Sequence, residues 1–273
     1  MAAYYLPKAY GKVMELLPLT YQECKAFILI LIRVSVILFA FPFFNARVIP
    51  ILVKAGLALF MTIALFPVID TTIPEFPHTL WGMVQLILVE LIVGMILGLL
   101  VQFFFEAIRI MGQLVGFQTG FAITNILDPQ SGIQISIFSN MAYLAAMTMF
   151  LLLNGHHIVL SAMRESFEII GVGRFSLSDR IFQNIMNLSA DMFVIAIKIG
   201  SPAIAALIFT KVAFGLITKL MPQMNIMIVA FPVQIVIGLL FFGMSLHVLL
   251  KVMERYLGGL GALLLNTMTL LGV

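Results

Sequence analysis

The stretch LWGMVQLILVELIVGMILGLLVQFFF, residues 80–105, contains a single charged side chain, Glu90. An α-helix rises about 1.5 Å per residue, so about 20 apolar residues cross the hydrocarbon layer of a bilayer, which is about 30 Å thick. The stretch is long enough to do so. It therefore predicts a membrane-spanning helix, and the rest of the chain can be interpreted from it.

The composition of the whole chain agrees with this prediction. Of its 273 residues, 62% are hydrophobic and 10% are charged, and the mean hydropathy is +1.15. A soluble chain carries about 25% charged residues. With so few charges the chain could not cover a water-facing surface, so its apolar surface must meet lipid, other subunits or both.

Further apolar runs lie on both sides of this stretch and are joined by short connections. They occupy residues 26–44, 48–69, 133–153, 191–220 and 226–250, followed by a short apolar tail at 257–273. Hydropathy therefore predicts about six spans, with a break at Ser201-Pro202 in the fifth run. We expect one all-α membrane domain over residues 1–273.

Several functional classes are disfavoured. The net charge is only +3 and the basic residues are scattered, so nothing indicates nucleic-acid binding. Cys24 is the only cysteine, which excludes an intrachain disulfide and a thiolate metal cluster. No catalytic or nucleotide-binding motif is present, and His156 and His157 are adjacent, a spacing that cannot chelate a metal as an i,i+4 pair would. We expect no enzyme activity, no cofactor and no metal.

Five charged residues lie in or near the apolar runs: Arg33, Lys54, Glu90, Lys198 and Lys211. A charge exposed to lipid costs about 2.5–3.5 kcal/mol or more. These residues could line an ion or proton path, or they could pair across helices and contact other subunits. Proton-coupled carriers concentrate acids in their spans, but here only Glu90 is central to one. Pairing or subunit contact is the favoured interpretation.

Glycines recur every four residues at Gly112, Gly116 and Gly120, so they share one face of a helix. Small residues at this spacing allow a neighbouring backbone to approach closely. Gly94 and Gly98 repeat the spacing, where ordinary tight helix packing is the favoured interpretation. The residues beside Gly112, Gly116 and Gly120 include Phe117, Gln118 and Phe121, and this mixture of polar and aromatic side chains disfavours a helix that faces lipid. That segment suits a pore constriction or a subunit contact.

The order of several motifs resembles one known family. They are Arg33, Pro42-Phe43, the segment 47–57 (RVIPILVKAGL), Glu90 to Gly94, the segment 112–121 (GQLVGFQTGF) closing on Asp128-Pro129, Asn154 to His157, Pro222-Gln223-Met224-Asn225, Ala230-Phe231-Pro232, and Gly238. Together they are similar to the FliR family, the export-gate subunit of bacterial flagella, which includes the T subunit of injectisomes. Lys219, Gly171 and Thr210-Lys211 depart from the family pattern, and Met224 favours the flagellar branch.

The resemblance implies a function and a set of partners. One copy would assemble with several FliP and FliQ subunits into a gate in the bacterial inner membrane, at the flagellar basal body. FlhB- and FlhA-like export components would contact this gate, and unfolded export substrates would pass through it. The resemblance also implies hydrophobic helical hairpins and kinked helices, packed against sister subunits and largely displaced from the bilayer plane.

The resemblance also assigns two groups of residues. The central loop, implied to plug the closed channel, carries Gly112, Gly116, Phe117, Gln118, Gly120, Phe121, Asp128 and Pro129. Packing and subunit contacts are expected at Arg33, Glu90, Gly94, Gly98, Pro222, Gln223, Met224 and Asn225. The alternatives are an injectisome gate subunit, a structural subunit without a gating part, and a stand-alone secondary transporter. A transporter would have midplane acids and two related halves, and neither is clear in the sequence.

Overall fold

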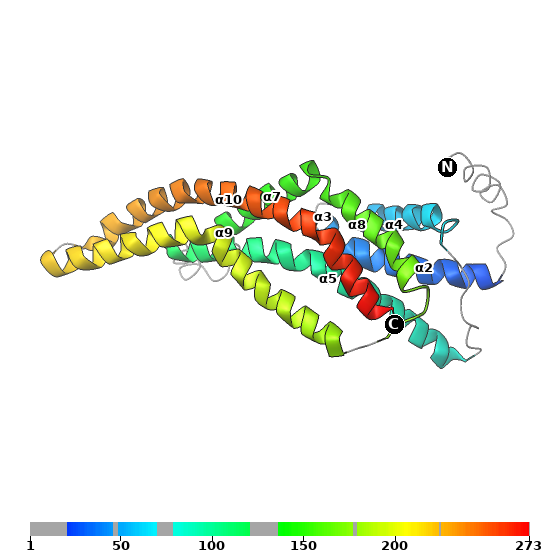
Figure 1. Ribbon diagram of the computed structural model, residues 1–273. Helices are drawn as coiled ribbons and strands as arrows, with labels where there is room; N and C mark the ends of the chain where they lie inside the picture. Colours follow the sequence, from blue (N-terminus) through cyan, green and yellow to red (C-terminus); the bar gives the residue numbers. More distant parts are fainter. Residues whose placement is uncertain are drawn as a thin grey trace. The chain divides into compact units, whose positions relative to one another are not determined.

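The computed structural model describes residues 21–45, 49–69, 79–120, 136–176, 179–223 and 225–272. Every regular element within these ranges is a helix, which confirms the predicted all-α fold (Figure 1). The helices are α2 (Tyr21–Ala40), α3 (Pro42–Asn45), α4 (Ile51–Leu65), α5 (Leu80–Gln118), α7 (Ile137–Leu152), α8 (Gly155–Ile169), α9 (Asp179–Leu220) and α10 (Ile226–Leu271).

Three helices, α5, α9 and α10, are long and apolar enough to cross a membrane. The pair α7 and α8 passes the same test together but is bent by 69° at its junction. Asn154 there has a positive φ of 58°, a backbone conformation typical of the residue that ends a helix. The described residues thus contain three or four candidate spans, where hydropathy alone predicted about six.

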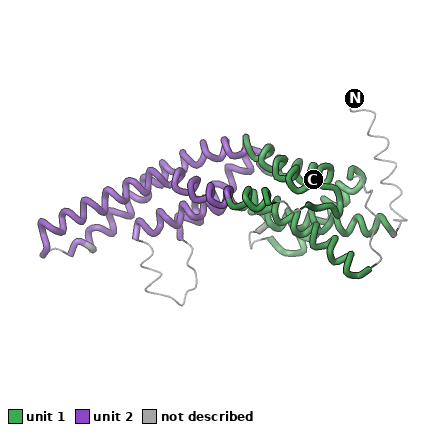
Figure 2. Tube along the Cα trace, turned by 60° about the horizontal axis from the view of Figure 1, so that its bottom comes forward, with its two compact units in different colours: residues 1–102, 156–186, 259–273 green, residues 103–155, 187–258 purple. Residues whose placement is uncertain are grey.

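The chain divides into two compact units (Figure 2). Unit 1 contains residues 1–102, 156–186 and 259–273, and unit 2 contains residues 103–155 and 187–258. Both units are therefore built from segments that are far apart in the sequence. The single domain expected over residues 1–273 stays a prediction, and each unit is described here by itself.

In unit 1, α2 packs closely against the first part of α5. A Cβ added at Gly98 would lie 2.2 Å from the Cβ of Ala40, and one at Gly94 would lie 3.0 Å from Val36. Real Cβ atoms do not approach as closely as 2.2 Å, so Gly98 is required for this helix crossing, and Gly94 lies in tight contact. The tight packing expected for Gly94 and Gly98 therefore occurs inside the chain.

In unit 2, the second part of α5 lies in the core and packs against α7, α9 and α10. Its buried side chains recur at the three- and four-residue spacing of a helix face, at Phe104, Phe105, Ile108, Met111 and Val115. The rings of Phe105 and Phe150 from α7 meet edge to face with their centroids 5.4 Å apart, and Phe138 meets Phe242 from α10 at 5.1 Å. Aromatic pairs at these distances stabilise a core beyond the area they bury.

Three predicted boundaries are wrong. α5 does not end at Phe105 but continues to Gln118, and the tail is no separate element because α10 runs unbroken to Leu271. α9 also continues through Pro202. Proline has no N–H for the Lys198 carbonyl, but the hydroxyl of Ser201 donates to that carbonyl at 2.9 Å. This side-chain bond replaces the missing helix bond, so the expected break does not occur.

Candidate functional site

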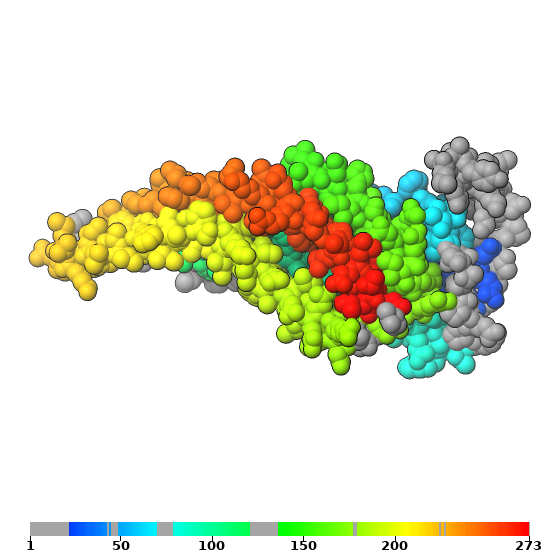
Figure 3. All heavy atoms as spheres, viewed as in Figure 1, coloured from blue at the N-terminus to red at the C-terminus, as the bar shows by residue number. Residues whose placement is uncertain are grey.

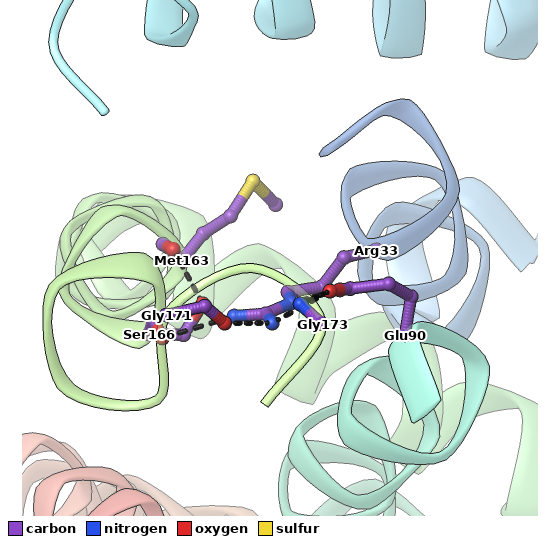
Figure 4. Close-up of polar contacts among 6 residues, drawn as sticks. All are labelled: Arg33, Glu90, Met163, Ser166, Gly171 and Gly173. Carbon is purple, nitrogen blue, oxygen red and sulfur yellow. Dashed lines mark hydrogen bonds and ion pairs between the residues drawn. The ribbon is translucent and has the colours of Figure 1, made fainter. Parts of the chain in front are cut away.

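Arg33 and Glu90 form an ion pair in unit 1 with no exposure to solvent (Figure 4). The Nε of Arg33 donates to Oε2 of Glu90 at 2.5 Å, and its Nη2 donates to Oε1 at 3.1 Å. Arg33 comes from α2 and Glu90 from α5, on faces that the apolar spacing already directs inward. The two charges predicted to pair across helices therefore do so with each other.

The end of α8 supplies the remaining partners of this pair. The guanidinium of Arg33 donates to the carbonyl oxygens of Ser166 at 2.9 Å and Gly171 at 2.7 Å. The backbone N–H of Gly173 donates to Oε1 of Glu90 at 2.7 Å. Carbonyls at a helix C-terminus carry partial negative charge, which favours a cation at this position.

Two glycines shape the backbone that follows α8. Gly171 and Gly173 have φ values of 68° and 73°, in the left-handed region that other residues rarely adopt. This turn directs the Gly171 carbonyl and the Gly173 N–H toward the ion pair. The Arg33–Glu90 cluster, defined here as Arg33, Glu90, Ser166, Gly171 and Gly173, thus joins three helices through one buried ion pair.

The contacts of the Arg33–Glu90 cluster indicate a structural role. Both charged groups are fully buried, and Arg33 makes four hydrogen bonds while its guanidinium lies 4.4 Å from the ring centroid of Phe167. Both oxygens of the Glu90 carboxylate are occupied, by Arg33 and by the Gly173 N–H. The geometry supports packing inside the chain rather than ion transport.

The second candidate site lies in unit 2, where α5 ends and α7 begins. A Cβ at Gly112 would lie 2.3 Å from the Cα of Ser139, so the two backbones are in direct contact. A Cβ at Gly116 would lie 2.1 Å from the Oγ of Ser136. The hydroxyl of Ser139 also donates to the Arg109 carbonyl at 3.0 Å. These contacts hold the last turns of α5 against the start of α7.

Gly120 and Gly238 close this arrangement against α10. Gly120 has a φ of 86°, and a Cβ there would lie 2.5 Å from the ring of Phe231. About two turns further along α10, a Cβ at Gly238 would lie 2.2 Å from Cγ2 of Thr119. We call Gly112, Gly116, Thr119, Gly120, Ser136, Ser139, Phe231 and Gly238 the loop base.

The structure changes the expected extent of the central loop. Gly112 to Gln118 belong to α5, and Gly112 and Gly116 are buried in it. Phe121, Asp128 and Pro129 lie outside the described residues. The glycines at 112 and 116 therefore belong to a helix, and the part of the predicted central loop that follows Gly120 lies outside the described residues.

Two further parts of the predicted sites are described. Phe117 is exposed, and Gln118 accepts a hydrogen bond from Nζ of Lys211 on α9 through its Oε1 atom. Pro222, Gln223 and Asn225 are exposed in the turn between α9 and α10, while Met224 lies outside the described residues. This exposed turn and the loop base both belong to unit 2.

The loop base gives a direct prediction for stability. Gly112→Ala should lower the thermal stability of the purified protein by an amount typical of overpacking, about 1–3 kcal/mol, because its Cβ would clash with the Ser139 backbone. Gly243→Ala on α10 is the matched control, since nothing lies within 4 Å of its Cβ position. Alanine there should be neutral or stabilise the helix by about 0.5–1 kcal/mol. Thermal unfolding followed by circular dichroism measures both, and equal effects would contradict the close approach at Gly112.

Sequence reasoning missed several of the partners in both sites. Ser166, Gly173, Ser136 and Ser139 gave no signal, because their roles depend on residues far along the chain. Gly171 was noted only as a departure from a family pattern, yet its carbonyl binds Arg33. Glycines in a short polar connection could have suggested a left-handed turn, but not which cation the turn would face.

These features define a class of protein. The chain is an all-α membrane protein, with apolar helices of spanning length and a charged pair neutralised in its interior. Its sequence matches the family described as bacterial export proteins, family 1, over residues 24–260. The chain therefore belongs to this family, as its resemblance to FliR predicted.

Individual relatives agree with the family. The chain is 29% identical over 251 residues to the flagellar biosynthetic protein FliR of Bacillus subtilis, covering 91% of this chain and 96% of that protein. It is 28% identical to FliR of Escherichia coli, covering 77% of this chain and 79% of that protein. FliR of Aquifex aeolicus is also 28% identical, over 82% of this chain and 86% of that protein.

Proposed function

We propose that this chain is a subunit of the bacterial flagellar type III protein export gate, situated in the inner membrane at the flagellar basal body. It forms part of the channel for unfolded export substrates, and the segment 121–135 closes this channel when no substrate passes. Its partners are FliP- and FliQ-like gate subunits and FlhB- and FlhA-like export components. The relatives named FliR support the flagellar assignment over an injectisome gate.

The observation that carries this proposal is the amount of uncovered apolar helix. α5, α9 and α10 contain 39, 42 and 46 residues. At about 1.5 Å per residue they measure about 58, 63 and 69 Å, roughly twice the hydrocarbon layer of about 30 Å. Large apolar side chains are exposed along all three helices, for example Met95, Phe209 and Val236. A bilayer cannot cover apolar helices of this length, so we infer that other protein chains bury part of their exposed apolar surface.

The loop base supports the gating part of the proposal. A closed channel must block ions yet yield to a polypeptide, which requires a short movable segment on a fixed support. Gly112 and Gly116 hold the end of α5 against the start of α7 through contacts with Ser139 and Ser136, and such a base is the fixed support that we propose for the segment 121–135. A stand-alone transporter is less well supported, because its best candidate for a coupling acid, Glu90, is occupied by Arg33.

Co-expression tests the proposed function. Expressed alone, the chain should be heterogeneous in detergent, because much apolar surface stays uncovered. Expressed with the FliP- and FliQ-like proteins of the same genome, it should purify as one discrete complex that contains all three, as measured by native mass spectrometry. A monodisperse homo-oligomer that transports a solute in liposomes would overturn the proposal.

A further inference from the structure

The last residues of α5 contact the hairpin formed by α9 and α10, which we define as residues 199–250. Figure 3 shows the two helices of this hairpin side by side, from yellow to orange, and all of these residues belong to unit 2. Gln118, Thr119 and Gly120 each contact the hairpin. The segment 121–135 follows them directly in the sequence, so the hairpin holds the residues from which that segment starts.

These three contacts differ in kind. Thr119 and Gly120 meet α10 through apolar contacts; a Cβ at Gly238, for example, would lie 2.2 Å from Cγ2 of Thr119. Apolar contacts are non-directional, so such surfaces can slide past each other. The contact of Gln118 is polar, because its Oε1 atom accepts a hydrogen bond from Nζ of Lys211 on α9. A hydrogen bond is directional and must break before its partners move apart.

Lys211 is a charged residue in apolar surroundings. It is the only charged residue between positions 199 and 218, and residues 226–250 of α10 contain none. Its neighbours on α9 include the exposed apolar side chains of Ile208 and Val212. A cation in such a setting is costly unless it has a partner. Among the residues that the structure describes, Lys211 forms no ion pair, and Gln118 is its hydrogen-bond partner.

Lys211 also supplies a charge that the end of α5 lacks. The carbonyl groups at the C-terminus of a helix carry partial negative charge, and a cation near the last turn stabilises them. The last turn of α5 has no basic residue of its own. Lys211 reaches the side chain of Gln118, the residue that ends α5, so its ammonium lies beside this turn. The contact therefore stabilises the helical form of the residues that precede the segment 121–135.

The acceptor of this hydrogen bond is neutral. Breaking an ion pair in apolar surroundings leaves two charges without partners, whereas breaking the bond between Lys211 and Gln118 leaves one. Gln118 is half-buried and Lys211 is exposed, unlike the fully buried Arg33–Glu90 pair. The bond thus suits a contact that holds the end of α5 and is released in a working cycle.

We propose that Lys211 is the latch of the closed gate: its bond to Gln118 holds the last turn of α5, and with it the start of the segment 121–135, in the closed position. Passage of a substrate requires this bond to open. Gly112 and Gly116, earlier in α5, stay packed on α7 and form the fixed part. Lys211 thereby acts as a positioning residue, and this role rests on the proposed function of the segment 121–135.

Hydrogen exchange of the assembled complex measures the latch independently of the channel. Lys211→Met keeps an unbranched side chain and removes the ammonium. A hydrogen bond to a charged group changes an equilibrium about tenfold or more, so the amides of residues 117–120 should exchange about tenfold faster. Lys219→Met, which removes an exposed cation from the same helix, is the matched control and should leave this exchange unchanged. Equal exchange in the two variants would overturn the proposal, whether or not the segment closes the channel.

The solute permeability of cells without export substrate tests the closing role. Lys211→Gln should raise the solute flux about tenfold at equal levels of complex. Gln118→Lys alone, which places two cations together, should also leak. The two changes combined restore a lysine–glutamine bond with its partners exchanged, so the flux should return to near the wild-type level. Failure of this exchange to restore the barrier would overturn the proposal. Loss of another subunit from the Lys211→Gln complex would do so too, because Lys211 would then bind that subunit.

A stronger latch should have the opposite effect on export. Gln118→Glu turns the bond into an ion pair, which should keep the barrier intact and reduce substrate export several-fold at an unchanged level of complex. A purely structural contact would become stronger without slowing export, so unchanged export would overturn the proposal. If deletion of residues 121–125 makes the channel leak and Lys211→Gln does not, the latch is wrong and the proposed function stands. If neither variant leaks, both are wrong.

Discussion

Glu90→Leu should destabilise the protein by about 3–5 kcal/mol, because it leaves the guanidinium of Arg33 buried without its carboxylate. Folded proteins are stable by only about 5–15 kcal/mol. The yield of folded complex should therefore fall sharply. The loss extends beyond one ion pair, since the Gly173 N–H loses its acceptor as well. Export and motility should fall in proportion to the complex that remains.

Two related variants separate charge from shape. Glu90→Gln should be milder, because an amide oxygen in the same place can still accept hydrogen bonds from Arg33 and Gly173. Arg33→Met combined with Glu90→Leu should cost less than the two single changes added together, since no unpaired charge remains. That non-additivity is the signature of a buried pair.

The exposed pair Arg164–Glu168 provides the matched control. Its atoms approach to 2.9 Å, but the side chains are 57% and 51% exposed. Exposed pairs contribute about 0–1 kcal/mol, so Glu168→Gln should barely move the unfolding temperature. Thermal unfolding of the purified complexes measures the five variants: Glu90→Leu, Glu90→Gln, Arg33→Met, the double variant and Glu168→Gln. If Glu90→Leu matched Glu168→Gln, the buried cluster would not hold the three helices together.

The sequence alone predicted the class of protein and much of the helix packing. Apolar runs predicted a helical membrane protein, and the spacing of Gly94 and Gly98 predicted a close helix crossing. Both follow from local rules, because helix periodicity and side-chain size depend on neighbouring residues. The pairing of Arg33 with Glu90 could be favoured in general terms, because unpaired charges are costly in an apolar setting.

The sequence predicted the ends of the helices less well. The change in composition after Phe105 suggested that α5 ends there, yet Glu106 and Arg109 pair one turn apart and Arg109 lies 4.1 Å from the ring centroid of Tyr143. Pro202 suggested a break, but Ser201 supplies the missing hydrogen bond. In both places the contact of a side chain lets the helix continue past a position where the sequence predicted an end or a break. Such a contact is seen only in the three-dimensional structure.

Deletion of residues 121–125 should leave the complex assembled and make its channel leak. The deletion begins after Gly120 because the glycines of the loop base are in tight contacts with Ser136, Ser139 and Phe231. Changes within the base should instead impair packing, as Gly112→Ala tests. If the segment 121–125 closes the channel as proposed, its deletion opens the channel without disturbing the contacts of the loop base. Deletion of residues 72–76, in the connection between α4 and α5, is the control of equal length.

The decisive measurement is the permeability of cells to a small solute when they express the complex with the 121–125 deletion and no export substrate. We expect a large rise over the wild-type complex and over the 72–76 deletion, at equal levels of assembled complex. An unchanged permeability barrier alongside normal complex levels would contradict it, because the seal would then lie outside this loop.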